Sequence, residues 1–129
     1  MATPEQINEI VAAYFAATRA MDKAAWLATF AEDGVSIDPV GAPPMDTNEK
    51  RAAFFDGIVG AFETVGLSEQ EIYLADNSAA VKWTGQGTGK NGREVSFAGI
   101  DVFEINDQGK IHSIRGYWNP AAMMAELLG

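Results

Sequence analysis

The stretch EVSFAGIDVFEINDQGKIHSIRGYWN, residues 94–119, decides the fold class of this chain. It contains two apolar segments that are rich in β-branched and aromatic residues. Between them lies Asn106-Asp107-Gln108-Gly109, a run typical of a hairpin turn. The stretch therefore predicts two antiparallel strands, over residues 94–105 and 110–119.

Two shorter segments before this stretch follow the same pattern. Strands are predicted over residues 71–74 and 79–84, and the turn signals Asp76-Asn77-Ser78 and Lys90-Asn91-Gly92 bound the second of them. Successive hairpins of this kind form an antiparallel meander.

Helical patterns dominate the first half of the chain. Thr3, Pro4 and Gln6 predict a capped helix, whose apolar stripe at three- and four-residue steps includes Tyr14. Two more helices are expected, from Asp22 to a stop at residues 31–34 and from a capping box of Asp46 and Glu49 to about residue 62. A strand over 35–38, a proline-rich loop over 39–44 and a short helix over 120–129 complete the prediction. Helices followed by a meander predict an α+β fold with one curved sheet.

Composition fits one domain over residues 1–129 and excludes several classes of partner. With 47% hydrophobic residues and no cysteine, the chain is expected to fold around one core without disulfide bonds. Nine basic and 18 acidic residues give a net charge of −9, the wrong sign for binding nucleic acid or an anionic membrane. No signal-peptide or membrane-spanning pattern is found, so we expect a cytoplasmic protein.

Three residues stand out as acid–base candidates. Asp38 ends an otherwise apolar strand, and Asp101 lies between apolar neighbours in another. A buried carboxyl at Asp101 would stay protonated and donate a hydrogen bond, while a more solvated Asp38 would accept protons. Tyr14 would be a second donor, and such a set suits the formation of an enolate. A turn-capping Asp38, a solvent-facing Asp101 and a core Tyr14 are the alternatives.

Other motifs give weaker signals. The run Gly85-Gln86-Gly87-Thr88-Gly89-Lys90 superficially suggests a phosphate loop, but neither Ser/Thr nor a helical pattern follows it, which favours a hairpin. His112 has no cysteine or second histidine to form a metal site, so neither a metal nor a cofactor is expected. Strand alternation places the small Gly116 between Ile114 and Trp118, leaving room there for a flat ligand.

Taken together, these residues carry a resemblance to a known enzyme family. Tyr14, Phe30-Ala31-Glu32-Asp33, Asp38-Pro39-Val40-Gly41 and Ile100-Asp101-Val102-Phe103 resemble the Δ5-3-ketosteroid isomerases, the steroid Δ-isomerases of the NTF2-like superfamily. The resemblance implies a cone-shaped α+β fold. In such a fold, a curved, mainly antiparallel sheet and about three N-terminal helices enclose an apolar pocket, usually in a homodimer.

The same resemblance implies roles for individual residues. Asp38 matches the general base that moves a proton from C4 to C6 of a 3-oxo-Δ5-steroid. Tyr14 and a protonated Asp101 match the oxyanion hole. The residues expected to contact the substrate are Thr18, Phe55, Gly99, Ile114, Gly116 and Trp118.

Two departures from the family's pattern concern hydroxyl groups. Family members usually carry tyrosine where this chain has Phe55, and some carry a hydroxyl where it has Phe30. We therefore predict fewer hydrogen-bond partners for Tyr14 than in those members. The leading hypothesis is a cofactor-independent steroid Δ-isomerase with a small apolar substrate. The alternatives are a non-catalytic binding module of the same fold, and a lyase or cyclase that uses Asp38 on another carbonyl compound.

Overall fold

Four helices and five strands make up the chain. The computed structural model describes residues 1–129. The helices are α1 (Pro4–Arg19), α2 (Lys23–Leu27), α3 (Asn48–Val59) and α4 (Pro120–Leu128). The strands are β1 (Phe30–Ile37), β2 (Phe62–Ala75), β3 (Ser78–Gly89), β4 (Glu94–Ile105) and β5 (Ile111–Tyr117). None of the helices combines the length and the apolar character needed to cross a membrane.

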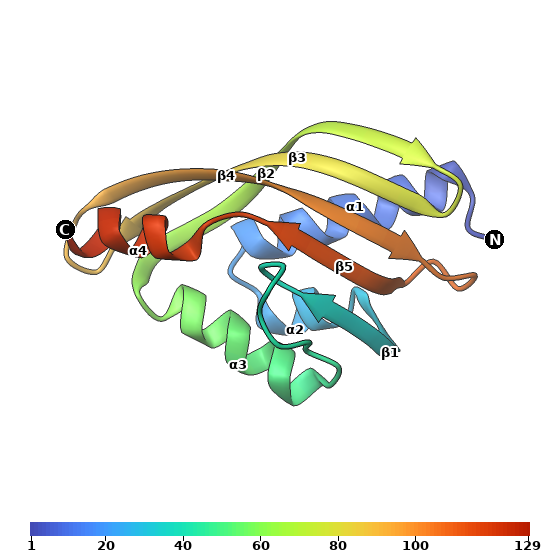
Figure 1. Ribbon diagram of the computed structural model, residues 1–129, viewed down its shortest axis with the longest axis horizontal. Helices are drawn as coiled ribbons and strands as arrows, with labels where there is room; N and C mark the ends of the chain where they lie inside the picture. The colour runs from blue at the N-terminus through green and yellow to red at the C-terminus, as the bar shows by residue number, and fades with distance from the viewer.

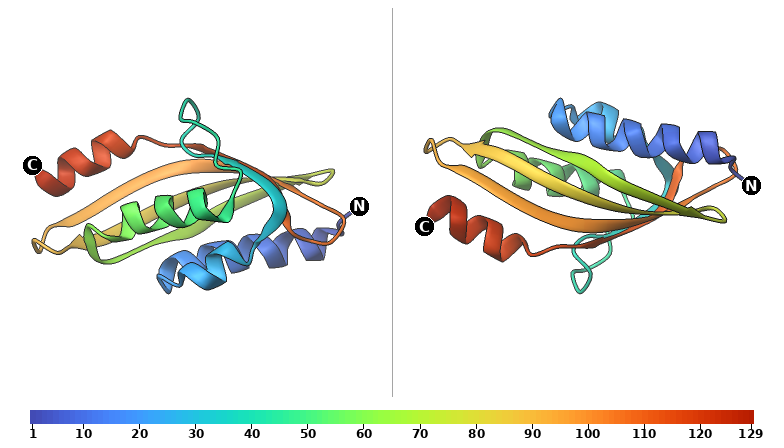
Figure 2. Two further views of the ribbon diagram at one scale, coloured as in Figure 1. Left: turned by 90° about the horizontal axis from the view of Figure 1, so that it is seen from below. Right: turned by 90° about the horizontal axis from the view of Figure 1, so that it is seen from above.

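The five strands form one curved sheet in the order β1-β5-β4-β3-β2 (Figure 1). Strands β2 to β5 pair as an antiparallel meander, and β1 runs parallel to its neighbour β5. Figure 2 shows α1 and α4 towards opposite ends of the molecule, with the termini far apart. The predicted fold class is confirmed: an α+β fold with a curved, mainly antiparallel sheet and three N-terminal helices.

Helix α1 begins where the capping box predicts. Thr3 N donates to Gln6 Oε1 at 2.9 Å, and Gln6 N donates to Thr3 Oγ1 at 3.1 Å. These two bonds satisfy backbone amides that a helix start leaves unpaired. The predicted stripe is buried, including Ile7, Val11 and Tyr14, so Tyr14 points into the protein.

Strands β2 and β3 are longer than predicted, by residues 62–70 and 85–89. The prediction missed these parts because glycines interrupt the alternation of polar and apolar side chains. A Cβ on Gly87 would lie 2.8 Å from the Phe62 ring, and one on Gly85 would lie against the Phe97 ring. These glycines are therefore strand residues that make room for aromatic rings, and the hairpin interpretation of residues 85–90 is confirmed.

The segment after α2 differs from the prediction. Helix α2 ends at Leu27, and β1 begins at Phe30, so residues 31–34 belong to a strand and do not terminate a helix. The β1–β5 register shifts between Phe30 and Val35. A Cβ on Gly34 would lie 2.8 Å from the Ile111 carbonyl oxygen, so this glycine permits close approach of the two strands.

The cap of α3 also differs by one residue from the prediction. Thr47 Oγ1 accepts the Lys50 N–H at 3.1 Å, whereas Asp46 forms an ion pair with the Lys50 side chain at 2.9 Å. The helix ends at Val59 with Gly60 as its C-cap, three residues before the predicted end, and Phe62 is instead the buried first residue of β2.

Two apolar clusters hold the layers together. The larger one joins α1 and α2 to the middle of the sheet through side chains such as Phe15, Trp26 and Phe103. The smaller one joins α4 to the start of β2 and β4, and its members are Phe62, Val65, Val95, Met123 and Leu127. Both clusters border an apolar pocket between the helices and the sheet.

Candidate active site

A narrow apolar pocket lies between the helices and the sheet. It encloses about 70 Å³, and 11 of its 15 lining residues are hydrophobic. The lining residues are Tyr14, Thr18, Trp26, Asp38, Phe54, Phe55, Ile58, Val59, Val65, Gly66, Leu67, Trp83, Phe97, Asp101 and Trp118. The two carboxyl groups and the phenol singled out from the sequence are therefore brought to one cavity.

Asp38 reaches the pocket from the end of β1. Ile37, the residue before it, pairs with Arg115 of β5, and beyond it the Val40 N–H donates to the Gly116 carbonyl at 2.8 Å. The half-buried Asp38 carboxylate accepts the indole N–H of Trp118 at 2.6 Å on its Oδ1 atom. Trp118 thus fixes the orientation of this carboxylate in addition to lining the pocket.

Asp101 lies deeper, on β4, between Val81 of β3 and Gly116 of β5. Its side chain is 1% exposed, and its Oδ1 atom makes no hydrogen bond within the chain. The indole nitrogen of Trp83 on β3 is also buried without a hydrogen bond of normal geometry, although it lies near enough to Asp101 to favour the ionised form of that carboxyl. Buried polar atoms are nearly always paired, so these two mark a place where a polar ligand atom would be stabilised.

Gly116 separates the two carboxyl groups. A Cβ at this position would lie against Asp38 Oδ1 and 3.2 Å from Asp101 Oδ1. The space above this glycine was predicted to admit a flat ligand, but the Asp38 carboxyl lies there. Glycine is needed at this position because any larger residue would collide with the Asp38 carboxyl.

Tyr14 comes from α1 and is 3% exposed. Its ring packs edge-on against Phe15 and Phe103, with centroids 5.1 Å away in both cases. Its hydroxyl has no hydrogen bond that meets normal geometry, and the neighbouring Phe55 offers no hydroxyl. Burial, then the charges of Asp101 and Asp38, raise the pKa of Tyr14 well above its usual range, so it remains a proton donor at neutral pH.

The environments of the two carboxyl groups differ in degree. Burial raises the pKa of Asp101 well above its ordinary value, the charge of Asp38 raises it further, and the nearby Trp83 indole N–H lowers it only in part. Burial also raises the pKa of Asp38, but the hydrogen bond from Trp118 favours its ionised form. The pocket therefore favours the state in which Asp38 is ionised and Asp101 protonated, an acid and a base side by side.

The remaining predicted contact residues lie in different places. Thr18, Phe55 and Trp118 line the pocket. Gly99 does not line the pocket. It lies behind Trp83, which does, and a Cβ on Gly99 would come 2.6 Å from the Trp83 ring. Ile114 is 1% exposed in the main core and does not line the pocket.

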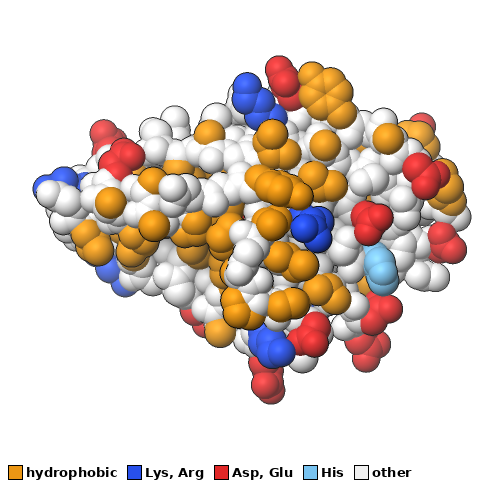
Figure 3. All heavy atoms as spheres, in the orientation of Figure 1, with side chains coloured by type: hydrophobic (Ala, Val, Ile, Leu, Met, Phe, Trp, Pro, Cys, Tyr) orange, Lys and Arg blue, Asp and Glu red, His pale blue; other side chains and the backbone are white.

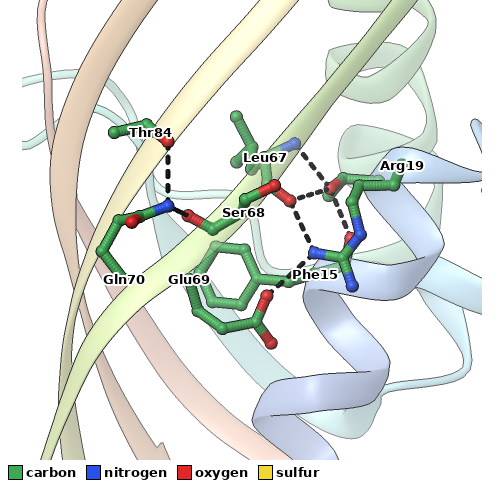
Figure 4. Close-up of polar contacts among 8 residues, drawn as sticks. Phe15, Arg19, Leu67, Ser68, Glu69, Gln70 and Thr84 are labelled. Atoms are coloured by element: carbon green, nitrogen blue, oxygen red, sulfur yellow. Dashed lines mark hydrogen bonds and ion pairs between the residues drawn. The ribbon is translucent and has the colours of Figure 1, made fainter.

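The Thr18 hydroxyl is already engaged within the protein (Figure 4). It donates to the Phe15 carbonyl at 2.6 Å and accepts the Leu67 N–H at 3.1 Å. The adjacent Arg19 donates to the Leu67 carbonyl at 2.9 Å and pairs with Glu69 at 2.8 Å. These bonds tie α1 to β2, so Thr18 offers a ligand contact area, and its O–H donor is already used within the protein.

Sequence reasoning missed most of the apolar wall. Trp26, Phe54, Trp83 and Phe97 line the pocket, yet each fits the pattern of an ordinary core residue. Periodicity separates inward from outward positions but does not separate a pocket wall from a packed core. No group of three or more His, Asp or Glu side chains is arranged to hold a metal ion.

Comparison with known proteins identifies the family. A family model described as a SnoaL-like domain matches residues 11–114, most of the chain and every pocket-lining residue except Trp118. The chain belongs to the SnoaL-like domain family. This SnoaL-like chain has the NTF2-like cone fold, and it carries Asp38, Asp101 and Tyr14 inside the matched region.

Three solved structures are similar to this SnoaL-like chain over nearly their whole length. One is SalBIII, described as an epoxide hydrolase/cyclase-like enzyme with a role in pyran ring formation in the polyether salinomycin. It is 27% identical with a TM-score of 0.82, over 93% of this chain and 95% of that one. An LEH-like epoxide hydrolase of M. tuberculosis is 21% identical with a TM-score of 0.76, over 96% and 90%. A Δ5-3-ketosteroid isomerase from Mycobacterium sp. is 23% identical with a TM-score of 0.77, over 88% and 93%.

The buried Asp101 predicts a stability difference that depends on pH. Its pKa is raised in the folded state, so between the ordinary aspartate pKa and the folded value the unfolded chain binds fewer protons. Stability falls with rising pH in that range, by about 1.4 kcal/mol per pH unit. Asp101→Asn removes this dependence. In urea unfolding from pH 4 to 8, the free energy of unfolding of the variant should therefore rise relative to that of the wild type as pH rises. Parallel profiles for the two proteins would contradict a buried, protonated Asp101.

Proposed function

We propose that this protein is a steroid Δ-isomerase that converts 3-oxo-Δ5-steroids to 3-oxo-Δ4-steroids without a cofactor. The observation that carries the proposal is the placement of Asp38 and Asp101 on either side of Gly116, with Tyr14 in the same apolar pocket. Two carboxyl groups with different proton affinities supply a base and an acid at one site.

Each step of the reaction has a residue suited to it. The Asp38 carboxylate removes a proton from C4, and the electron pair of that C–H bond moves into a dienolate with its negative charge on the C3 oxygen. Asp101 and Tyr14 donate hydrogen bonds to that oxygen and stabilise the charge more in the transition state than in the ground state. Protonated Asp38 then returns the proton to C6, which leaves the conjugated C4=C5 bond.

The apolar wall suits this chemistry in two ways. It excludes water, which strengthens the hydrogen bonds to the developing oxyanion. It also matches the hydrocarbon body of a steroid. The enclosed volume of about 70 Å³ is smaller than a typical ligand pocket, so the reacting end of the steroid would be enclosed first. The rest would displace half-buried side chains of α3, namely Phe54, Ile58 and Val59.

Direct assay tests the proposal. The protein is mixed with a 3-oxo-Δ5-steroid, and the ultraviolet absorbance of the newly conjugated enone is followed. A saturable, protein-dependent rise supports the isomerase. Saturable binding of a steroid or phenol without any rise would favour a non-catalytic binding module, and the absence of both would overturn the steroid substrate.

A cyclase is a second candidate, favoured by the 27% identity with SalBIII over 93% of the chain. In that reaction protonated Asp101 would give its proton to an epoxide oxygen as one C–O bond breaks. Asp38 would take the proton of an internal hydroxyl as the new C–O bond forms. Conversion of an apolar epoxy alcohol to a cyclic ether, with no activity on the 3-oxo-Δ5-steroid, would favour this reaction over isomerisation.

We also propose that two copies associate through the outer face of the sheet. Ile100 of β4 and Tyr117 of β5 pair there in register and are 45% and 47% exposed. Figure 3 shows hydrophobic side chains gathered over this part of the molecule. Exposed apolar patches on a sheet are typical of interfaces.

Gel filtration tests this association. Ile100→Asp places a charge in the middle of the patch and is expected to convert a dimer to a monomer. Leu128→Asp is the matched control, because Leu128 is 71% exposed at the end of α4, outside the patch. A wild type that elutes as a monomer, or an Ile100→Asp variant that remains a dimer, would contradict the proposal.

A further inference from the structure

Arg51 is a buried cation with no carboxylate within ion-pair distance, and the charge of Asp46 acts on it only from further away. Its side chain is 1% exposed, and it forms no ion pair with a carboxylate. Long charged side chains are rarely buried to this extent unless they are paired. The residue does not line the pocket, so the proposed reaction does not explain it.

The hydrogen bonds of Arg51 end on backbone and amide oxygens. From α3, its Nη1 donates to the Gly34 carbonyl at 2.6 Å, and the Met45 carbonyl lies 3.4 Å from the same atom. Its Nε and Nη2 both donate to Asn48 Oδ1, at 3.3 and 3.0 Å. The guanidinium carbon lies 4.8 Å above the centre of the Phe30 ring.

These carbonyl groups lie on both sides of the loop that carries Asp38. Gly34 belongs to β1, which enters the loop, and Met45 lies where the chain leaves it. Ser36 and Met45 close the loop through two backbone hydrogen bonds of 2.9 and 2.8 Å. Figure 2 shows the loop projecting between β1 and α3. Arg51 thus connects both ends of the Asp38 loop to helix α3.

We propose that Arg51 is a positioning residue for Asp38. It acts by holding the backbone on both sides of the Asp38 loop. This keeps the Asp38 carboxylate in one orientation, in which it accepts the Trp118 hydrogen bond and faces the substrate. This inference rests on the proposed function for its kinetic consequence only. Its structural consequence, the geometry of the Asp38–Trp118 hydrogen bond, is independent of any substrate.

The effect is geometric and not a matter of charge. The influences that shift the pKa of Asp38 are its burial and the Trp118 hydrogen bond, and Arg51 is not among them. Misplacement of a reacting group by about 1 Å can cost about 100-fold in rate. Loss of Arg51 should therefore lower kcat and leave ligand affinity nearly unchanged.

Two variants and one control test the role. Arg51→Met fills the space without donating hydrogen bonds. Arg51→Lys keeps the charge, but its single ammonium group cannot reach both Gly34 and Asn48 as the planar guanidinium does. Lys50→Met is the control, since Lys50 is the preceding, exposed cation of the same helix. For each protein, kcat and KM for the steroid are measured, together with the NMR signal of the Trp118 indole N–H, assigned with Trp118→Phe.

The expected result is a fall in kcat of about 10- to 100-fold in Arg51→Met, a smaller fall in Arg51→Lys, and a moved Trp118 signal in both. An unmoved signal would overturn the inference, and so would failure of both variants to fold, since Arg51 would then hold the whole fold. If the wild type does not isomerise steroids but the signal still moves, the proposed function fails and the positioning role stands.

Discussion

Asp38→Asn is expected to lower the kcat for steroid isomerisation by about 10²- to 10⁴-fold, the contribution of a positioned general base. Asparagine has nearly the same shape as aspartate, and its amide oxygen can still accept the Trp118 N–H that lies 2.6 Å from Asp38 Oδ1. The pocket should therefore keep its form and lose only the group that carries the proton.

Binding separates loss of the base from loss of the site. Asp38→Asn should bind a phenol or a product-like steroid as well as the wild type, because Asp101 and Tyr14 are unchanged. Asp107→Asn is the matched control: it removes an exposed aspartate that pairs with the N-terminal amine, and it should retain full activity. A variant at Asp38 that turns over as fast as the wild type would show that another group moves the proton.

Much of the fold could be predicted because its signals are local. One hairpin was predicted correctly from the turn at residues 106–109 and the alternation of β4. The start of α1 was predicted correctly from the Thr3 capping box. The predicted strand boundaries were wrong where the local preference of a residue disagrees with its tertiary contacts. Gly85 and Gly87 weaken a strand pattern, yet they are required in β3 because aromatic rings pack onto them.

Asp38, Asp101 and Tyr14 were predicted to act as one set, but only the family resemblance implied that they share a pocket. Asp101 faces Gly116 through the register of β4 and β5, and Asp38 reaches the same point through a loop whose path no periodicity describes. The hydrogen bond from Trp118 to Asp38 joins residues 80 positions apart. Such contacts depend on strand register and loop closure, which are properties of the whole fold.

Gly116→Ala is expected to lower kcat by about 100-fold, the cost of moving a reacting group by about 1 Å. The added methyl group would collide with Asp38 Oδ1 and approach Asp101 Oδ1 to 3.2 Å, so the Asp38 carboxyl must move. Initial rates, steroid binding and thermal unfolding are measured on the same preparation. Gly57→Ala is the control, because a Cβ there meets nothing within 4 Å.

A double variant shows whether Gly116 acts through the base. If the methyl group lowers the rate by displacing Asp38, then adding Gly116→Ala to Asp38→Asn should cost much less than the 100-fold expected in the wild type. Two changes that act on one group are not additive. A full, additive loss in the double variant would instead mean that the methyl group acts on Asp101 or on substrate binding. A single variant that keeps its kcat would show that the narrow gap between the two carboxyl groups is not needed for turnover.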